Sequence, residues 1–400
     1  MMDSISHDQV MEEDALSSSS LPIMKRLGIL GGGQLGQMSA QAAQKLGIST
    51  HIYTPQAEGP ASLVADETTV SDWNDADALK RFADSVDVVT WEFEHIPVET
   101  AQILSQWVPV YPQPHVLELS QSRWLEKQFL AQNGIPVAPF ALVSQPEHLE
   151  SAGRKVEYPL VLKTIHSGYD GKGQERANNL VALRCAYASF GNVPCVAERF
   201  LPLEREISVI GARDASGRIE LFPPFENSHR NHILDITLVP ARINDAMSRQ
   251  AKEITTRILE ALDMRGLLCV EFFIDKNGQL LVNELAPRPH NSGHLTIEAA
   301  VSSQFEQHVR AVCGLELKSC SSLKPSAMVN LLGNLWEQGE PNWQALEGQS
   351  DLFLHLYGKK GAAKGRKMGH ITVLGRNTFE AGKRAVDMRE SLTSGSVVTA

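Results

Sequence analysis

Cysteine is scarce in this sequence, and no pair of cysteines has the spacing of a metal-binding or redox motif. The 400 residues contain five cysteines and no C-x-x-C, which argues against a disulfide-stapled scaffold and suits a reducing compartment. No apolar run approaches the roughly 20 residues that a membrane-spanning helix needs. The net charge of −10 disfavours a nucleic-acid-binding surface. We therefore expect a cytoplasmic protein that acts on small molecules, with no membrane or nucleic-acid partner.

The first 24 residues are acidic and serine-rich. They lack the apolar stretch of a secretory signal and the arginines of a transit peptide, so we expect a disordered extension. The whole chain is 42% hydrophobic, which is ample for a globular enzyme of two or three domains.

From Lys25 onward, strand and helix signals alternate, which predicts a doubly wound parallel α/β unit. The strands of this unit are expected at 27–30, 51–53, 63–65 and 86–90, and its helices at 35–46 and 75–83. Later helices are expected at 122–133, 180–189 and 245–262. Later strands are expected at 158–163, 195–198, 206–211, 219–223 and within 270–285, before a last α+β portion. The predicted fold class is thus α/β and α+β, in segments 1–24, 25–118, 119–196, 197–320 and 321–400.

The first glycine loop, Gly31–Gly36, satisfies G-x-G-x-x-G between a strand and a helix, the context of a dinucleotide-binding fingerprint. That function also needs an acidic residue at the end of the second strand, which here ends at Thr54 without one. Free backbone N–H groups at a helix N-terminus bind anions. We therefore expect this loop to hold a phosphate and disfavour NAD, although an NAD(P)-dependent oxidoreductase remains an alternative.

A second glycine-rich loop spans 166–174 and follows Lys163 at the end of a strand. It is not a P-loop, because G-x-x-x-x-G-K-[ST] occurs nowhere in the chain. Its glycines let backbone amides approach oxyanions closely, and a flexible hairpin turn is the alternative. In the acidic stretch that follows, 198–206, strand-edge backbone could bind an adenine edge and Glu206 could accept from ribose hydroxyls; a solvated charged face is the alternative.

Two glutamates are predicted to face each other in a β-hairpin. Asn277-Gly278 separates two apolar runs, a strong signal for a two-residue primed turn. That turn pairs Glu271 with Glu284 on one side of the sheet, roughly 5 Å apart at Cβ. Two converging carboxylates need a cation between them, and hard oxygen ligands favour Mg²⁺. A hairpin with two solvated glutamates is the alternative.

A cluster of basic residues near the C-terminus is unexpected in an acidic protein. Its members are Lys359, Lys360, Lys364, Arg366 and Lys367. Arginine gives bidentate contacts to phosphate and lysine a point charge, so the cluster indicates a phosphate site, with a basic surface loop as the alternative. The histidine pairs His229/His232 and His290/His294 are more typical of hydrogen-bonding histidines than of a zinc site.

Five motifs together resemble the ATP-grasp superfamily and, within it, the 5-(carboxyamino)imidazole ribonucleotide synthetases. They are GILGGGQLGQM (28–38), WEFEHIP (91–97), GYDGKGQ (168–174), NELAPRPHNSGH (283–294) and GRKMGHI (365–371). The resemblance covers nearly all of the chain after the extension. It implies an ATP-grasp fold with an N-terminal doubly wound parallel domain and a small C-terminal α+β portion.

The resemblance also implies a role for individual residues. ATP contacts would come from Arg123, Lys163, Gly168, Tyr169, Asp170, Gly171, Lys172, Gly173, Gln174, Glu198, Arg199, Phe200, Leu201, Glu206, His229, Asn283 and Glu284. Mg²⁺ would be held by Glu271 and Glu284. The catalytic residues, which act on bicarbonate and the amine, would be Lys163, Arg288, His290 and Asn291. The ribonucleotide would be bound by Gln34, Leu35, Glu94, Tyr169, Asp170, Lys359, Arg366 and Lys367.

The implied activity is the ATP-dependent carboxylation of 5-aminoimidazole ribonucleotide with bicarbonate in purine biosynthesis, by a homodimeric ligase. The nearest alternative is another ATP-grasp ligase, a formate-dependent glycinamide ribonucleotide transformylase, which GYDGKGQ and PRPHNSGH disfavour. A catalytically silent interaction protein is disfavoured because every charged position of the motifs is filled.

Overall fold

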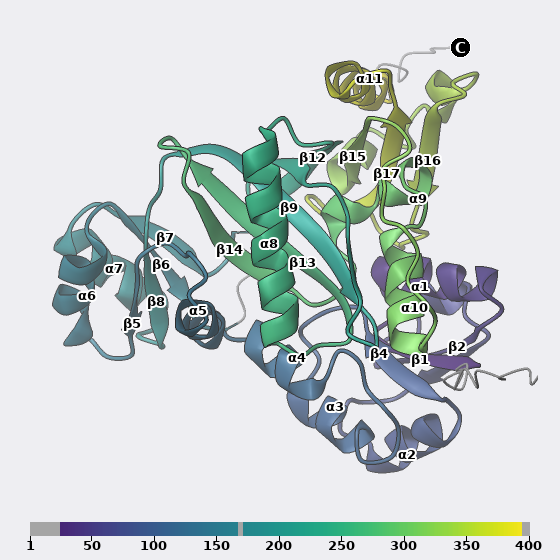
Figure 1. Cartoon of the computed structure of the whole chain (residues 1–400), viewed down its shortest axis with the longest axis horizontal. Helices are drawn as coiled ribbons and strands as arrows, with labels where there is room; N and C mark the ends of the chain where they lie inside the picture. The colour runs from purple at the N-terminus through teal and green to yellow at the C-terminus, as the bar shows by residue number, and fades with distance from the viewer. Residues whose placement is uncertain (1–24, 167–170, 394–400) are drawn as a thin grey trace, which may run out of the picture.

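The computed structural model describes residues 25–166 and 171–393. The expected extension at 1–24 and the loop residues Gly168, Tyr169 and Asp170 therefore lie outside the described residues. The N-terminal domain forms one end of the molecule, the small lobe another, and the C-terminal strands and helix a third (Figure 1).

The N-terminal domain contains a parallel sheet, as predicted, and the order of its strands is β3-β2-β1-β4. Its strands are β1 (Arg26–Leu30), β2 (Ser49–Thr54), β3 (Glu67–Val70) and β4 (Val88–Trp91). Its helices are α1 (Gln34–Lys45), α2 (Ala76–Asp84), α3 (Val98–Leu104) and α4 (Pro114–Ser120). The strand expected at 63–65 is wrong: a 3-10 helix, Ala61–Leu63, ends there, and Leu63 is exposed. Three apolar residues are too few to distinguish a strand from a turn.

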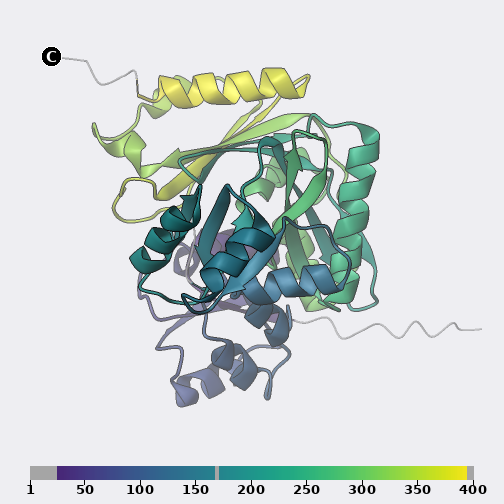
Figure 2. The same ribbon diagram turned by 90° about the vertical axis from the view of Figure 1, so that its left-hand side faces the viewer.

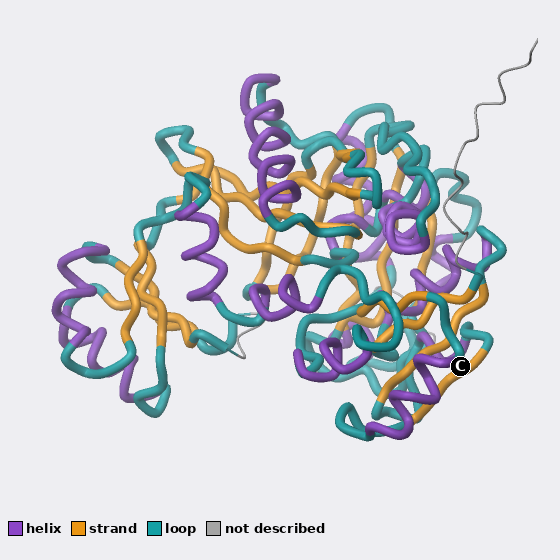
Figure 3. Tube along the Cα trace, turned by 60° about the horizontal axis from the view of Figure 1, so that its bottom comes forward, coloured by secondary structure: helices purple, strands orange, loops and turns teal. Residues whose placement is uncertain are grey.

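Helix α5 (Arg123–Gln132) leads into a small lobe that lies at one end of the molecule (Figure 3). The lobe is an antiparallel sheet of order β5-β8-β6-β7. Its elements are β5 (Phe140–Val143), α6 (His148–Val156), β6 (Leu160–Thr164), β7 (Gln174–Ala177), α7 (Leu180–Ser189) and β8 (Cys195–Arg199). Helices α6 and α7 pack on this sheet and close its core.

The largest sheet runs through both the large lobe and the C-terminal portion, in the order β14-β13-β9-β11-β12-β15-β17-β16, with β10 beside β9. Its large-lobe strands are β9 (Leu203–Arg213), β10 (Ile219–Leu221), β11 (Phe225–Arg230), β12 (Ile233–Val239), β13 (Gly266–Asp275) and β14 (Leu280–Ala286). Its C-terminal strands are β15 (Ser326–Leu332), β16 (Leu352–Leu356) and β17 (Lys367–Leu374). Helix α11 (Thr378–Ser391) lies along the C-terminal strands (Figure 2).

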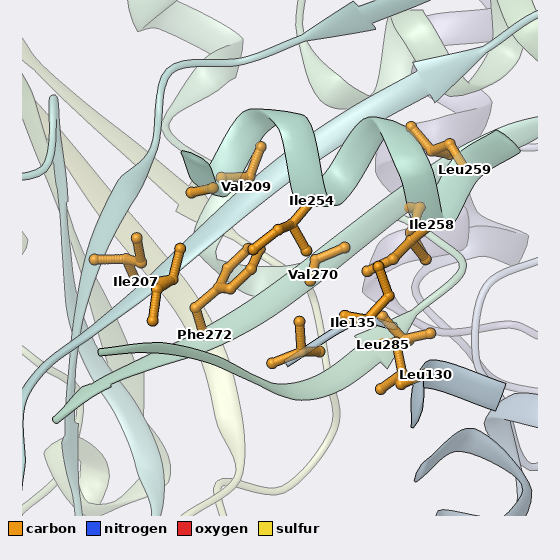
Figure 4. Packing of buried hydrophobic residues seen from close by; sticks show 14 of the residues in the cluster. Leu130, Ile135, Ile207, Val209, Ile254, Ile258, Leu259, Val270, Phe272 and Leu285 are labelled. Atoms are coloured by element: carbon orange, nitrogen blue, oxygen red, sulfur yellow. The ribbon is translucent and has the colours of Figure 1, made fainter. Parts of the chain in front are cut away.

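The core of the large lobe lies between β9, β13, β14 and helix α8 (Asp245–Ala261). Side chains such as Ile254, Ile258, Val270 and Phe272 interdigitate there (Figure 4). Leu130 of α5 joins the same cluster, so α5 is anchored to the large lobe. Two further helices, α9 (Thr296–Ala299) and α10 (Gln304–Cys313), follow the hairpin.

The sequence-based prediction missed the hairpin of β11 and β12. Its two-residue turn is Asn231-His232, and both residues have positive φ, as a type I′ turn requires. Asn-Gly is the usual signature of this turn, so histidine at the second position hides it.

Candidate active site

A cleft of about 360 Å³ opens between the N-terminal domain, α5, the small lobe and β14. It brings together seven of the predicted site residues, which are Glu94, Arg123, Lys163, Glu198, Asn283, Glu284 and Arg288. Glu126 and Lys127 of α5, which were not predicted, also line it. The residues Arg199, Phe200, Leu201, Glu206, His229, Glu271, His290 and Asn291 are not among those that line this cleft.

The hairpin places Glu271 opposite Glu284, as predicted, but not by the predicted turn. The loop has three residues, because Asp275 pairs with Gln279, and Gly278 has the positive φ of a bulge-type turn. This longer loop shifts the pairing near the turn by one residue. A β-bulge at Asn283 then shifts it back, between Phe272–Val282 and Glu271–Glu284.

The two glutamates have different electrostatic surroundings. Burial alone would raise the pKa of Glu271, but His290, whose Nε2 lies 3.0 Å from Glu271 Oε1, holds it at about 2. The surrounding walls of the cleft and the like charge of Glu271 raise the pKa of Glu284. Glu284 is exposed and lines the cleft, whereas the side chain of Glu271 is 20% exposed.

Glu198 lies between two lysines at the base of the cleft. Its Oε2 lies 3.1 Å from Lys163 Nζ and 3.4 Å from Lys127 Nζ. Burial would raise the pKa of Glu198, but the two lysines hold it at about 2. Its other oxygen, Oε1, is buried and has no hydrogen-bond partner among the described residues, so it could accept a hydrogen bond from a ligand.

Four predicted residues outside the cleft form two charged pairs on or beside the large sheet, His229 with Glu206 and His290 with Glu271. His229 Nδ1 lies 2.7 Å from Glu206 Oε2, and this contact raises the pKa of His229 although burial would lower it. Asn291 is 9% exposed, and neither of its amide atoms has a partner among the described residues. Arg199 instead pairs with Glu157 at the surface of the small lobe.

The first glycine loop is not free to hold phosphate in the way that we predicted. Gly36 N donates to Glu92 Oε2 at 2.8 Å, and Gly33 N donates to Glu92 Oε1. A Cβ at Gly31 or Gly33 would lie 2.5–2.6 Å from Glu92 atoms, so these glycines make room for a carboxylate from within the chain. Burial raises the pKa of Glu92. The expectation of an open anion site is thus wrong for these two amides, while Gln34 and Leu35 begin α1 beside them.

The basic loop of the C-terminal portion reaches the N-terminal domain. Lys360 Nζ lies 2.6 Å from Glu58 Oε2, and Lys359 Nζ donates to Lys367 O at 2.7 Å. Burial, and then the charge of Arg366, lower the pKa of Lys359 to about 8. Arg366 Nη1 donates to the carbonyl oxygen of Gly361 at 2.8 Å. The fold therefore brings the predicted phosphate-binding loop close to the first glycine loop.

Arg288 and the second glycine loop both contact neighbouring parts of the chain. Arg288 Nε lies 2.6 Å from Glu94 Oε1, which ties the end of the hairpin to the N-terminal domain. In the second glycine loop, Gly171 and Gly173 have positive φ, and Gln174 pairs with Lys163. Lys172 lies between these two glycines.

Family models match most of the chain in three successive parts. The ribonucleotide synthetase preATP-grasp domain matches residues 24–121, the ATP-grasp domain residues 128–305, and the phosphoribosylaminoimidazole carboxylase C-terminal domain residues 326–384. The predicted ATP-grasp fold is thus confirmed. No helix of the described part of the chain is long and apolar enough to cross a membrane.

Curated relatives match over most of the chain. The N5-carboxyaminoimidazole ribonucleotide synthase of Brucella melitensis biotype 1 is 44% identical, over 89% of this chain and 98% of its own length. The enzyme of that name from Bacillus subtilis is 39% identical, over 87% and 91%. The chain also matches 38% of the length of the bifunctional purine synthesis protein purC/E of Dictyostelium discoideum, at 43% identity.

Solved structures agree with the sequence relatives. The ADP complex of an N5-carboxyaminoimidazole ribonucleotide synthetase superposes with a TM-score of 0.86 at 38% identity, covering 93% of this chain and 98% of that one. The Aspergillus clavatus N5-carboxyaminoimidazole synthase in complex with ADP and 5-aminoimidazole ribonucleotide gives 0.82 at 28% identity, covering 92% and 98%. The chain therefore belongs to the N5-carboxyaminoimidazole ribonucleotide synthase family.

Proposed function

We propose that this protein carboxylates 5-aminoimidazole ribonucleotide with bicarbonate, at the expense of ATP, to give N5-carboxyaminoimidazole ribonucleotide, ADP and phosphate in purine biosynthesis. The observation that carries the proposal is the match to this family over nearly 90% of the chain. The charged cleft between the lobes supports it. A formate-dependent ligase and an NAD(P)-dependent oxidoreductase have no such support.

ATP would lie in the cleft between the small lobe and β14. Lys163 and Arg123 supply positive charge for its phosphates. Glu198 is held ionised by lysines, and its open Oε1 could accept from a nucleotide hydrogen-bond donor. The backbone amides around Gly171 and Gly173 would close over the phosphates and exclude water, which otherwise hydrolyses reactive intermediates.

Mg²⁺ fits between the paired glutamates. Two opposed carboxylates, one with its pKa raised by burial and by the other's charge, form a site that gains from a cation. No group of three or more acidic, histidine or cysteine side chains in the described residues could hold a metal alone, so substrate phosphates would complete the coordination. When bound, Mg²⁺ would neutralise charge on the β- and γ-phosphates of ATP.

The chemistry would proceed without a covalent enzyme intermediate. A bicarbonate oxygen attacks the γ-phosphorus of ATP, which forms carboxyphosphate and releases ADP. The exocyclic amine of the ribonucleotide then attacks the carboxyl carbon, or CO₂ released in place, and phosphate leaves. Lys163 and Arg288, which line the cleft, would stabilise the negative charge that develops. His290 and Asn291, which follow Arg288 in the chain, would orient bicarbonate and the amine.

The ribonucleotide would bind between the first glycine loop and the basic loop. Lys359, Arg366 and Lys367 would contact its phosphate, with the amides of Gln34 and Leu35 at the start of α1. Glu94, already paired with Arg288, would lie between this site and the ATP site. We propose a homodimer, as the resemblance implies, and, from the composition of the chain, a protein that acts in the cytoplasm.

The proposal is tested by ADP release from ATP and bicarbonate, measured with and without 5-aminoimidazole ribonucleotide. We expect the ribonucleotide to stimulate ADP release strongly, and glycinamide ribonucleotide with formate to have no effect. Stimulation by formate and glycinamide ribonucleotide alone would instead assign the chain to the transformylase reaction.

A further inference from the structure

Helix α5 packs along the outer edge of β14, the strand that carries Glu284. Strand β14 is the last strand of the large sheet, so its outward backbone groups lack a neighbouring strand. The loop after α5 meets one of them, because Val282 N donates to Pro136 O at 2.8 Å. Two side chains of α5, Glu126 and Lys127, meet others.

These two side chains contact the backbone on both sides of Glu284. Leu285 N donates to Glu126 Oε2 at 3.0 Å, and Lys127 Nζ donates to Asn283 O at 2.8 Å. Glu126 is 4% exposed and Lys127 is 2% exposed. The peptide groups immediately before and after Glu284 are therefore fixed from the same helix.

The bulge at Asn283 determines which way Glu284 points. Without it, the register set by the turn would continue, and Asn283 would pair with Glu271. Glu284 would then pair with Val270, whose side chain lies in the core. A slip of one residue moves a side chain to the other face of a sheet, so the bulge is what turns Glu284 toward Glu271 and the cleft.

Covering a sheet edge does not by itself need buried ionisable side chains. A backbone carbonyl can accept from an outward N–H, as Pro136 O does from Val282 N, and burying ionisable groups is costly unless they are paired. The charge of Lys127 is neutralised by Glu198, whose Oε2 lies 3.4 Å from Lys127 Nζ. Helix α5 is itself fixed to the large lobe, because Leu130 packs in the core (Figure 4). Helix α5 therefore fixes the backbone of β14 on either side of Glu284.

We propose that Glu126 and Lys127 are positioning residues, which hold the bulge of β14 and thereby keep the Glu284 carboxylate opposite Glu271. The proposal rests on the metal role given to Glu284 above. It predicts that loss of the Glu126 contact weakens binding of the nucleotide in its Mg²⁺ form and leaves metal-free nucleotide binding unchanged.

The test compares Glu126→Leu, which removes the acceptor for Leu285 N, with Glu126→Gln, which keeps one. ADP binding is measured by calorimetry on the full chain, once with Mg²⁺ and once with EDTA. We expect Glu126→Leu to raise the Kd with Mg²⁺ by about tenfold and the Kd with EDTA by less than about twofold. Glu126→Gln, and Gln132→Leu at an exposed site of the same helix, should match the parent protein.

An equal loss of affinity with Mg²⁺ and with EDTA, or a loss in Glu126→Gln as large as in Glu126→Leu, would overturn the proposal. If Glu126→Leu does not fold, Glu126→Asp, which keeps the carboxylate but shortens its reach to Leu285 N, takes its place in the Mg²⁺ comparison. Glu284→Gln is the reference. If it loses the Mg²⁺-dependent affinity and the α5 variants do not, only the positioning role fails. If Glu284→Gln keeps that affinity, the metal role of Glu284 fails, and the inference fails with it.

Discussion

Replacing Glu284 with glutamine should separate catalysis from folding. The substitution keeps the size of the side chain and removes one of two negative charges that face each other across β13 and β14. Like charges in directly opposite positions destabilise an antiparallel pair, and such cross-strand effects amount to about 0.2–1 kcal/mol. Without ligands, the variant should therefore melt at the same temperature as the parent protein or slightly above it.

With ATP and Mg²⁺ bound, Glu284→Gln should instead be harmful, because it should lower turnover. One charge facing the metal is worth about 3 kcal/mol in the transition state, so turnover should fall by about two orders of magnitude or more. ADP release is measured at saturating Mg²⁺, and melting temperatures are measured with and without MgADP. A rate close to that of the parent protein would remove Glu284 from the site. A lower melting temperature without ligands would show that its role is structural.

Three further results follow from the geometry. Arg366→Ala should raise KM for the ribonucleotide by about ten- to several hundred-fold, as expected for a lost contact to a charged group. It should raise KM for ATP by less than about threefold. Equal changes in the two KM values would assign the basic loop to the ATP site. For the ribonucleotide, kcat/KM should fall above pH 8, because Lys359 has a pKa of about 8 and loses its charge above that pH. Lys359→Arg, which stays charged, should abolish this fall. NADH should not bind at micromolar concentrations, because Glu92 holds the Gly33 and Gly36 amides; stoichiometric binding seen by fluorescence would contradict this.

Helices were predictable from the sequence where their signals are local. The expected helix 180–189 coincides with α7, whose N-cap Asn179 accepts from Ala182 N, and Ser122 and Asn244 cap α5 and α8 in the same way. The errors fall where short apolar runs or turn residues carry little information. The strand expected at 63–65 and the unpredicted hairpin at Asn231-His232 are two such cases.

The functional site was predictable only in part, because several of its contacts join residues far apart in the sequence. The pairing of Glu271 with Glu284 is confirmed, although it results from a longer turn and a bulge whose shifts cancel. Neither the Glu92 contact with Gly33, 59 residues away, nor the Glu126 contact with Leu285, 159 residues away, has a local signal. In both cases a side chain binds backbone amides, so no complementary residue type appears in the sequence.

The most direct test of the proposed reaction follows the oxygen atoms of bicarbonate. The protein is incubated with ATP, Mg²⁺, 5-aminoimidazole ribonucleotide and ¹⁸O-labelled bicarbonate, and the released phosphate is examined by mass spectrometry or ³¹P NMR. Attack of bicarbonate on the γ-phosphorus predicts one ¹⁸O atom in each phosphate, formed in equal amounts with ADP and the carboxylated ribonucleotide. Phosphate without label, or ADP release without a carboxylated product, would contradict the proposed function.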